Sequence, residues 1–225
     1  MDLLIPAAGL ATRMRGLPKF LLPIDNSYTT ILEHHINSII KEGVDIENIW
    51  IATRPDLVSI LNTISFEGSN INIIPMETNT MNETILNLHK ISKAQYYMLI
   101  MPDTYFYGEN PYTKFENTPE YCDLAIWKIK DEQRGKLGEV SFNDDGILSE
   151  IIDKNPKANL EYSWGALVFS EKFINYIDKN DPHIGYSVAS ALKNNKKITT
   201  KTIKGEYFDC GTPEEYIELI KKVLI

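Results

Sequence analysis

Residues 1–19 constrain the fold of this chain more than any other segment. The apolar run Leu3–Pro6 predicts a buried strand, and the small residues of Ala7–Gly9 follow it directly. Side chains this small allow backbone N–H groups to approach a phosphate closely. Arg13, Arg15 and Lys19 add cations beside the loop. The pattern therefore predicts a strand followed by a loop that can hold a triphosphate.

The spacing of this loop separates it from two common phosphate-binding loops. Lys19 comes too late for the Gly-x-x-x-x-Gly-Lys-Ser/Thr pattern of a P-loop, and no Ser or Thr follows it. The Gly-x-Gly-x-x-Gly pattern is also absent, which disfavours a dinucleotide-binding fold. A strand-to-helix turn that happens to be rich in small residues is the alternative interpretation.

Composition limits the class of protein. A length of 225 residues suits one domain, and 43% hydrophobic with 24% charged residues is ordinary for a globular chain. No apolar run reaches the length of a membrane span. A net charge of −8 argues against nucleic-acid or anionic-membrane partners. Cys122 and Cys210 make no disulfide framework, and the N-terminus shows no leader pattern. We therefore expect a cytoplasmic protein.

Strand and helix patterns alternate in the first half of the chain. Four short apolar runs predict strands: Leu3–Pro6, Asn48–Thr53, Ile71–Pro75 and Tyr97–Met101. The segments between them predict helices: Thr30–Glu42, a short one from Pro55, and Asn82–Ser92. Thr30 and Glu33 have the spacing of a capping box. This alternation is typical of an α/β fold with a doubly wound, mostly parallel sheet.

Paired strands dominate after about Cys122. The predicted strands are Asp123–Lys128, Gly138–Phe142, Gly146–Ile152, Ser163–Phe169 and Ile198–Lys204. Helices are predicted over Glu171–Asp178, over Gly185–Asn194 and after a cap at Thr212. We therefore predict one domain over residues 1–225, with a nucleotide-binding half at about 1–121. The β-rich half, at about 122–225, would shape the site of a second substrate.

Two aspartates follow predicted strands. Asp103 comes just after Tyr97–Met101, at the sheet edge where open α/β folds bind ligands. Asp209 ends another strand, and Thr212 rather than Asp209 caps the following helix. One or two carboxylates together with substrate phosphates are the usual ligands of Mg²⁺. We therefore predict that Asp103 and Asp209 hold Mg²⁺, with a turn role for Asp103 as the alternative.

These segments resemble motifs of the sugar-phosphate nucleotidyltransferases, which include glucose-1-phosphate thymidylyltransferases and mannose-1-phosphate guanylyltransferases. Three segments carry the resemblance: Ala7-Ala8-Gly9-Leu10-Ala11-Thr12-Arg13 with Pro18-Lys19, Met101-Pro102-Asp103, and Phe208-Asp209-Cys210-Gly211-Thr212-Pro213. Gly138 and Asp153-Lys154-Asn155-Pro156 are similar to the weaker sugar-side motifs. The family joins a nucleoside triphosphate (NTP) to a phosphorylated sugar, releases pyrophosphate and has a Rossmann-like fold.

The resemblance implies a role for each motif residue. Arg13 and Lys19 would be catalytic, gripping the β,γ-phosphates and the α-phosphate. The nucleotide-binding set would be Ala7, Ala8, Gly9, Leu10, Arg13 and Lys19. The acceptor-binding set would include Gly138 and Lys154, with Lys154 on the acceptor phosphate. Trp164 is added to this set from its place in the β-rich half, with a core position as the alternative interpretation. Mg²⁺ would lie at Asp103 and Asp209. The partners would be an NTP and a small phosphorylated acceptor, and a homodimer stays open.

Departures from the family pattern leave the substrates open. Ala8 and Ala11 stand where the family usually has glycine, and Thr80–Thr84 replaces its Gly-Thr-Ala near the base. CTP with a non-sugar phosphate such as phosphocholine or a polyol phosphate is therefore an alternative substrate pair. Two alternatives of other classes are a glycosyltransferase, which usually needs an Asp-x-Asp pair, and a non-catalytic nucleotide sensor. Intact Arg13, Lys19 and both aspartates favour the transferase over these two.

Some aromatic residues have no assigned role. His34, His35, His89 and His183 lack the spacing of metal ligands. Tyr105, Phe106 and Tyr107 either cover the acceptor or pack a loop.

Overall fold

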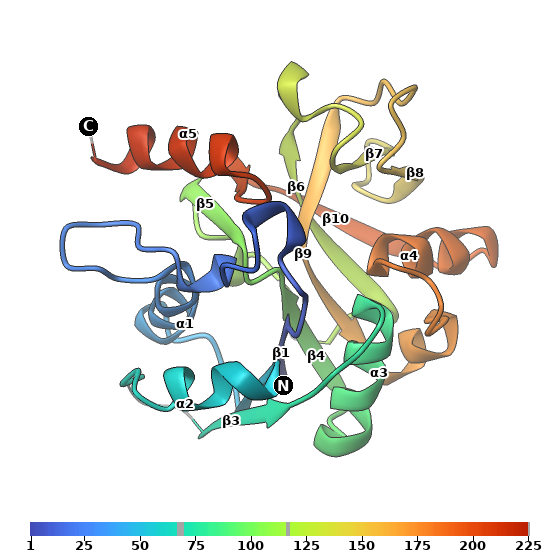
Figure 1. Cartoon of the computed structure of the whole chain (residues 1–225). Coiled ribbons are helices and arrows are strands. Elements are labelled where there is room, and N and C mark those ends of the chain that lie inside the picture. Colours follow the sequence, from blue (N-terminus) through green and yellow to red (C-terminus); the bar gives the residue numbers. More distant parts are fainter. Residues whose placement is uncertain (67–69, 116–117, 225) are drawn as a thin grey trace.

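A large, mostly parallel β-sheet forms the centre of the computed structural model (Figure 1). The structure describes residues 1–66, 70–115 and 118–224. The strands of the sheet are β1 (Asp2–Ala7), β2 (Asn48–Thr53), β3 (Asn70–Pro75), β4 (Tyr96–Ile100), β6 (Cys122–Lys128), β7 (Gly138–Phe142), β8 (Leu148–Asp153), β9 (Tyr162–Ser170) and β10 (Ile198–Thr202). Their order is β10-β6-β9-β4-β1-β2-β3, with β7 joined to β9 and β8 joined to β7. Strands from both halves of the chain thus form one continuous sheet.

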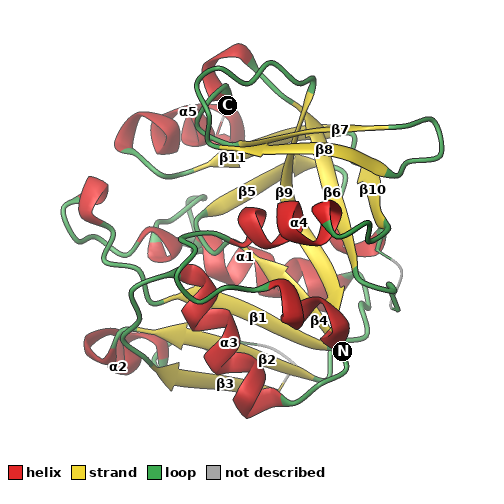
Figure 2. Cartoon of the chain, turned by 90° about the vertical axis from the view of Figure 1, so that its right-hand side faces the viewer, coloured by secondary structure: helices red, strands yellow, loops and turns green. Residues whose placement is uncertain are grey.

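Helices cover both faces of this sheet. On one face lie α1 (Ile31–Lys41) and α2 (Val58–Leu61), and on the other lie α3 (Met81–Ser92) and α4 (Ile184–Lys193) (Figures 1 and 2). Side chains of β1 alternate between the two layers, because Leu3 packs in the core with α1 while Leu4 packs in the core with α3. The predicted doubly wound α/β fold is confirmed.

Helix N-termini are fixed by the caps that the sequence predicted. Thr30 precedes α1, where the Glu33 N–H donates to Thr30 Oγ1 at 3.2 Å and the Thr30 N–H donates to Glu33 Oε2 at 2.8 Å. Before α5 (Pro213–Leu224), the Glu215 N–H donates to Thr212 Oγ1 at 3.3 Å. Such bonds satisfy donors that a helix start leaves free.

The second half departs from the prediction at one helix, because the chain over Glu171–Tyr176 forms 3₁₀ turns rather than an α-helix. The strands of this half have mixed directions: β10 runs parallel to β6, while β9 runs antiparallel to both β4 and β6. The change of direction at β9 places this strand in the middle of the sheet, between the two parallel sets.

Strands β5 (Thr104–Gly108) and β11 (Gly205–Asp209) form a separate antiparallel ladder. The sequence predicted a strand that ends at Asp209, but it left Tyr105–Tyr107 undecided between an acceptor cover and a packed loop. These residues form a strand, and the Phe106 ring stacks on Trp127 of the central sheet at a centroid distance of 5.0 Å. The aromatic packing holds the β5–β11 ladder against the sheet.

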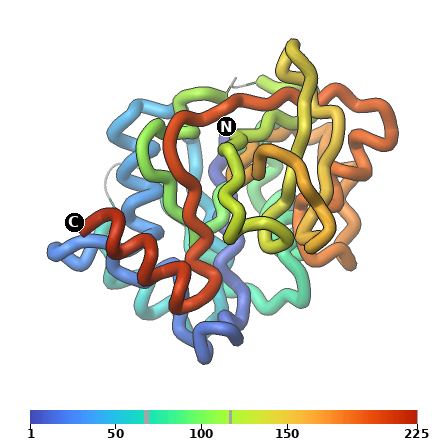
Figure 3. The backbone as a smooth tube through the Cα atoms, turned by 90° about the horizontal axis from the view of Figure 1, so that it is seen from above, coloured from blue at the N-terminus to red at the C-terminus, as the bar shows by residue number. Residues whose placement is uncertain are grey.

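The C-terminal helix packs against the N-terminal loop. Tyr216 of α5 donates from its hydroxyl to the Pro23 carbonyl at 2.6 Å, and Leu219 is buried in an apolar cluster with Met14 and Leu22. In Figure 3, α5 (red) runs beside a blue segment of the N-terminal region, while the chain ends marked N and C lie apart. Within the part of the chain that the structure describes, no helix combines the length and the apolar character that a membrane span needs. Cys122 and Cys210 are buried free thiols.

Candidate active site

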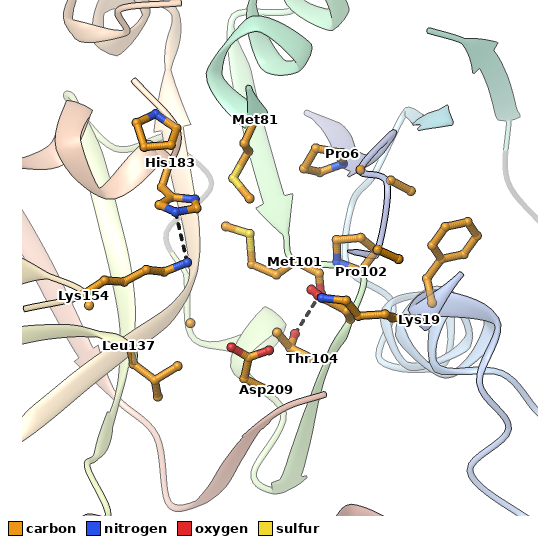
Figure 4. A pocket seen from close by; sticks show the side chains of 18 of the residues that line it. Pro6, Lys19, Met81, Met101, Pro102, Thr104, Leu137, Lys154, His183 and Asp209 are labelled. Carbon is orange, nitrogen blue, oxygen red and sulfur yellow. Dashed lines mark hydrogen bonds and ion pairs between the residues drawn. The ribbon is translucent and has the colours of Figure 1, made fainter. Parts of the chain in front are cut away.

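A cavity of about 340 Å³ lies at the carboxyl ends of β1 and β4, between the N-terminal loop and the β7–β8 region. It brings together most of the site residues that the sequence predicted: Ala7, Gly9, Arg13, Lys19, Asp103, Gly138, Lys154, Trp164 and Asp209. Figure 4 shows Lys19 on one side of the cavity and Lys154 on the other, with Met81 and Met101 between them. The cavity therefore has a cation at each end.

Two predicted nucleotide contacts lie outside the lining of this cavity. Ala8 is buried beneath the loop, and the side chain of Leu10 is 68% exposed. The nucleotide contacts of both residues stay predictions. Met81, which begins α3 in the region where a base contact was left open, does line the cavity.

The N-terminal loop owes its shape to left-handed backbone. Ala11 has φ 49°, Arg15 has φ 54° and Gly16 has φ 84° around a single 3₁₀ turn over Thr12–Met14. This conformation favours glycine, and an L-residue there is strained by about 1–2 kcal/mol. The position of Ala11 is one where the family usually has glycine, and the structure gives the physical reason. Arg13 and the buried Met14 are placed by this turn.

The β5–β11 ladder brings the two predicted metal carboxylates together. Thr104 lies opposite Asp209 in the register, and the Cys210 N–H donates to the Asp103 carbonyl at 2.8 Å. Asp103 therefore precedes one strand of the ladder and Asp209 ends the other. The sequence analysis predicted that these two residues meet at the edge of the parallel sheet. In the structure, the separate antiparallel pair β5–β11 brings them together.

Charges at the ladder are only partly balanced. The ammonium of Lys19 donates to Asp103 Oδ2 at 2.8 Å, and these side chains are 12% and 27% exposed. Burial, followed by the nearby charges of Asp103 and Glu215, raises the pKa of Asp209 to about 6. Burial and nearby like charges both disfavour the ionised form of a carboxyl group.

This donor set fits a divalent cation shared with a nucleotide. Among the described residues, no group of three or more His, Cys, Asp or Glu side chains is arranged to hold a metal ion by itself. Mg²⁺ is commonly held by one or two carboxylates, with substrate phosphates and water completing its oxygen ligands. Asp103 and Asp209 offer those carboxylates next to the triphosphate loop.

The opposite wall of the cavity is crowded around Gly138. A Cβ atom on this residue would lie 2.1 Å from Trp164 Nε1 and 2.6 Å from Asp153 Oδ1, so only glycine fits between the two side chains. Trp164 Nε1 and Asp153 Oδ2 are buried and have no hydrogen-bond partner among the described residues. Burial also raises the pKa of Asp153. Asp153 was absent from the predicted site residues, although it opens the weak Asp153–Pro156 motif.

Lys154 is held by a histidine that the sequence did not single out. Its ammonium donates to Nε2 of His183 at 3.1 Å (Figure 4). Burial, and then the charges of Lys154 and Arg13, lower the pKa of His183 to about 4, so the neutral ring can accept this bond. His183 lies just before α4, and its distance of 29 residues from Lys154 carries no signal in the sequence.

Comparison with protein families gives the class of this protein. The chain belongs to the nucleotidyl transferase family, whose sequence profile matches residues 3–224. The protein is therefore a nucleotidyltransferase.

Solved structures share the fold over nearly the whole chain. A UDP-glucose pyrophosphorylase complexed with UDP-glucose is 19% identical, with a TM-score of 0.79 and coverage of 98% of this chain and 97% of that chain. A UTP-bound UDP-glucose pyrophosphorylase from Acinetobacter baumannii is 16% identical, with a TM-score of 0.75 and coverage of 98% and 92%. A Bacillus anthracis protein designated a glucose-1-phosphate thymidylyltransferase, in complex with sucrose, is 20% identical, with a TM-score of 0.77 and coverage of 99% and 95%.

One curated protein also matches in sequence. The DNA replication and repair protein RecF of Clostridium kluyveri is 29% identical over 160 residues, which is 70% of this chain and 43% of that protein. The chain thus spans less than half the length of this curated relative.

We expect Asp209→Asn to stabilise the metal-free protein at neutral pH. The native pKa of about 6 lies above the ordinary 3.8, so the native state binds the extra proton between these values. Stability from this carboxyl is therefore present below pH 3.8 and lost as pH rises through 6. At pH 7.5 the variant should gain about 1–3 kcal/mol in the free energy of unfolding. Urea unfolding with EDTA at pH 7.5 and 4 measures this, and an equal gain at both pH values contradicts it.

Proposed function

We propose that this nucleotidyltransferase is metal-dependent and transfers a nucleoside monophosphate from an NTP to a sugar 1-phosphate, giving a nucleoside-diphosphate sugar and pyrophosphate. The observation that carries the proposal is the single cavity that holds Lys19 with the carboxylate pair at one end and Lys154 at the other. Two phosphate-bearing substrates need two cationic subsites. The names of the structural neighbours, which are sugar-phosphate nucleotidyltransferases, support the same substrate class.

The reaction is an in-line displacement at the α-phosphorus of the NTP. An oxygen of the acceptor phosphate forms a new bond to this phosphorus, and the bond to the β-phosphate oxygen breaks, so that pyrophosphate leaves with the electron pair. A phosphate monoester is largely ionised at pH 7, and no general base is required. Catalysis then depends on positioning the two phosphates and on neutralising their charge.

Different side chains position and neutralise the phosphates at the two ends of the cavity. Lys19 places its ammonium at the α-phosphate, and Arg13 reaches the β,γ-phosphates with its fork of donors. Lys154 binds the acceptor phosphate, and neutral His183 orients its ammonium through the 3.1 Å bond. Asp103 and Asp209 would hold Mg²⁺, which would supply positive charge next to the phosphates.

The unpaired polar atoms near Gly138 favour a hydroxyl-bearing acceptor. Trp164 Nε1 is a donor and Asp153 Oδ2 is an acceptor, and a hydroxyl group can accept from the first and donate to the second. A sugar phosphate or a polyol phosphate can therefore satisfy both of these atoms through one hydroxyl group, a pair of hydrogen bonds that the quaternary ammonium of phosphocholine cannot make.

Lys19→Ala should lower kcat by about 100- to 1,000-fold with a smaller effect on the KM of the NTP, because its charge acts on the transition state. The assay is pyrophosphate release from a panel of NTPs and phosphorylated acceptors with the wild-type chain. Lys41→Ala, at the exposed C-terminal end of α1, is the control. Near-wild-type turnover of Lys19→Ala removes this lysine from the mechanism, and a wild-type chain that is inactive on the whole panel contradicts the proposed function.

Trp164→Phe keeps an aromatic ring and deletes the N–H group. Loss of one hydrogen bond to a sugar hydroxyl costs about 1 kcal/mol, so the KM of the acceptor should rise about fivefold. The KM of the NTP should not change, since Trp164 lies on the acceptor side. The matched control is Trp50→Phe. The N–H of Trp50 donates to Asp2 at 2.7 Å, and this pair lies outside the cavity lining. Steady-state kinetics with each substrate varied decide the point, and preferred turnover of phosphocholine by the wild-type chain contradicts the assignment.

A further inference from the structure

A fully buried histidine lies directly under the β5–β11 ladder. His35 of α1 has 0% exposure, and its Nε2 atom lies 2.7 Å from the Thr104 carbonyl oxygen. Its other ring nitrogen, Nδ1, lies 2.5 Å from the Tyr112 hydroxyl. The sequence gave this residue no role. A buried polar ring with two short contacts, one of them to the residue after Asp103, connects α1 with the metal-binding end of the cavity.

One proton arrangement satisfies both contacts. A carbonyl oxygen can only accept, so Nε2 must carry the proton and donate to Thr104. Nδ1 is then an acceptor, and the Tyr112 hydroxyl donates to it. Burial lowers the pKa of His35 to about 3, so the ring is neutral as this arrangement requires. The result is a directed chain of hydrogen bonds from Tyr112 through His35 to Thr104.

Thr104 is the residue through which these hydrogen bonds can affect the carboxylates of both Asp103 and Asp209. Successive carbonyls of a strand point to opposite sides. The Asp103 carbonyl points toward β11 and accepts from the Cys210 N–H at 2.8 Å, so the Thr104 carbonyl points to the other edge of β5, toward α1. Thr104 also lies opposite Asp209 in the ladder. A group that fixes the Thr104 carbonyl therefore fixes the residue next to one carboxylate and the partner of the other.

We propose that His35 is a positioning residue for the metal-binding pair: its bond to the Thr104 carbonyl holds the outer edge of β5 and thereby sets the relative placement of Asp103 and Asp209. This inference rests on the metal-dependent transfer proposed above. A side chain that only filled the space would leave the Thr104 carbonyl and the Tyr112 hydroxyl without this partner. Partners that orient metal ligands in this way typically matter about 10- to 100-fold in metal affinity or activity.

The test uses two substitutions of nearly equal size. His35→Gln places an amide N–H where Nε2 lies and can still donate to Thr104, whereas His35→Met fills the same space without a donor. His35→Asn is a second deletion variant, because its shorter amide reaches the Tyr112 hydroxyl but not Thr104. His89→Asn is the matched control, since His89 of α3 also bonds a tyrosine hydroxyl, that of Tyr97 at 2.7 Å, but lies outside the cavity lining.

Two readouts separate positioning from stability. Hydrogen exchange of the 204–211 segment reports on the Cys210 N–H and needs no catalysis, and the Mg²⁺ concentration for half-maximal turnover reports on the metal site. We expect His35→Met and His35→Asn to speed this exchange by about tenfold or more and to raise the half-saturating Mg²⁺ concentration by about tenfold. His35→Gln and the control His89→Asn should both stay close to the wild type in exchange and in Mg²⁺ dependence.

The outcomes are distinct. If His35→Met melts at a lower temperature but keeps wild-type exchange and Mg²⁺ dependence, or if His35→Gln behaves like His35→Met, the positioning role is wrong. If His35→Met does not fold, His35→Asn against His35→Gln decides by the same criteria. If the wild-type chain has no nucleotidyltransferase activity, the proposed function fails, and the exchange data alone still support or overturn the role of His35 in holding the ladder.

Discussion

The site depends on the antiparallel pairing of β5 with β11. Two carboxylates repel each other, and burying them together is costly unless positive charge is near. The ladder opposes this repulsion with backbone hydrogen bonds and with aromatic packing of Phe106 against Trp127. Lys19 balances one of the two charges at 2.8 Å, and the pKa of Asp209 rises to about 6. The fold thus holds a local excess of negative charge that a divalent cation would relieve.

Cations gather in one cavity of an otherwise acidic protein. The chain carries a net charge of −8, yet Arg13, Lys19 and Lys154 converge on one cavity. Different elements supply these cations: the strained N-terminal loop supplies the first two, and the end of β8 supplies the third. The sheet sets the distance between them, since β1 and β4 lead to the proposed nucleotide end and β7, β8 and β9 lead to the proposed acceptor end. The proposed order of the two substrates in the cavity follows from this arrangement.

Local patterns in the sequence predicted the parts of this structure that depend on local physics. Alternating apolar runs located β1 to β4, and Thr30 with Glu33 located the start of α1. The loop, Lys19 and the two aspartates were found because residue type and position relative to a strand identify them. Strand β5 was missed because its partner β11 lies about a hundred residues away in the sequence. The aromatic run Tyr105–Tyr107 alone does not indicate that such a partner exists. His183 and His35 were missed for the same reason, since each acts through a contact made only in the folded chain.

The central claim is that Asp103 and Asp209 together hold one divalent cation with the nucleotide. Mn²⁺ is a spin probe for such a site, and electron paramagnetic resonance of the free ion measures its binding to the protein in the presence of an NTP. The account predicts tight Mn²⁺ binding by the wild-type chain and binding weakened by about tenfold or more in both Asp103→Asn and Asp209→Asn, with the fold intact by circular dichroism. Wild-type Mn²⁺ affinity in either variant would contradict a site built on the β5–β11 ladder.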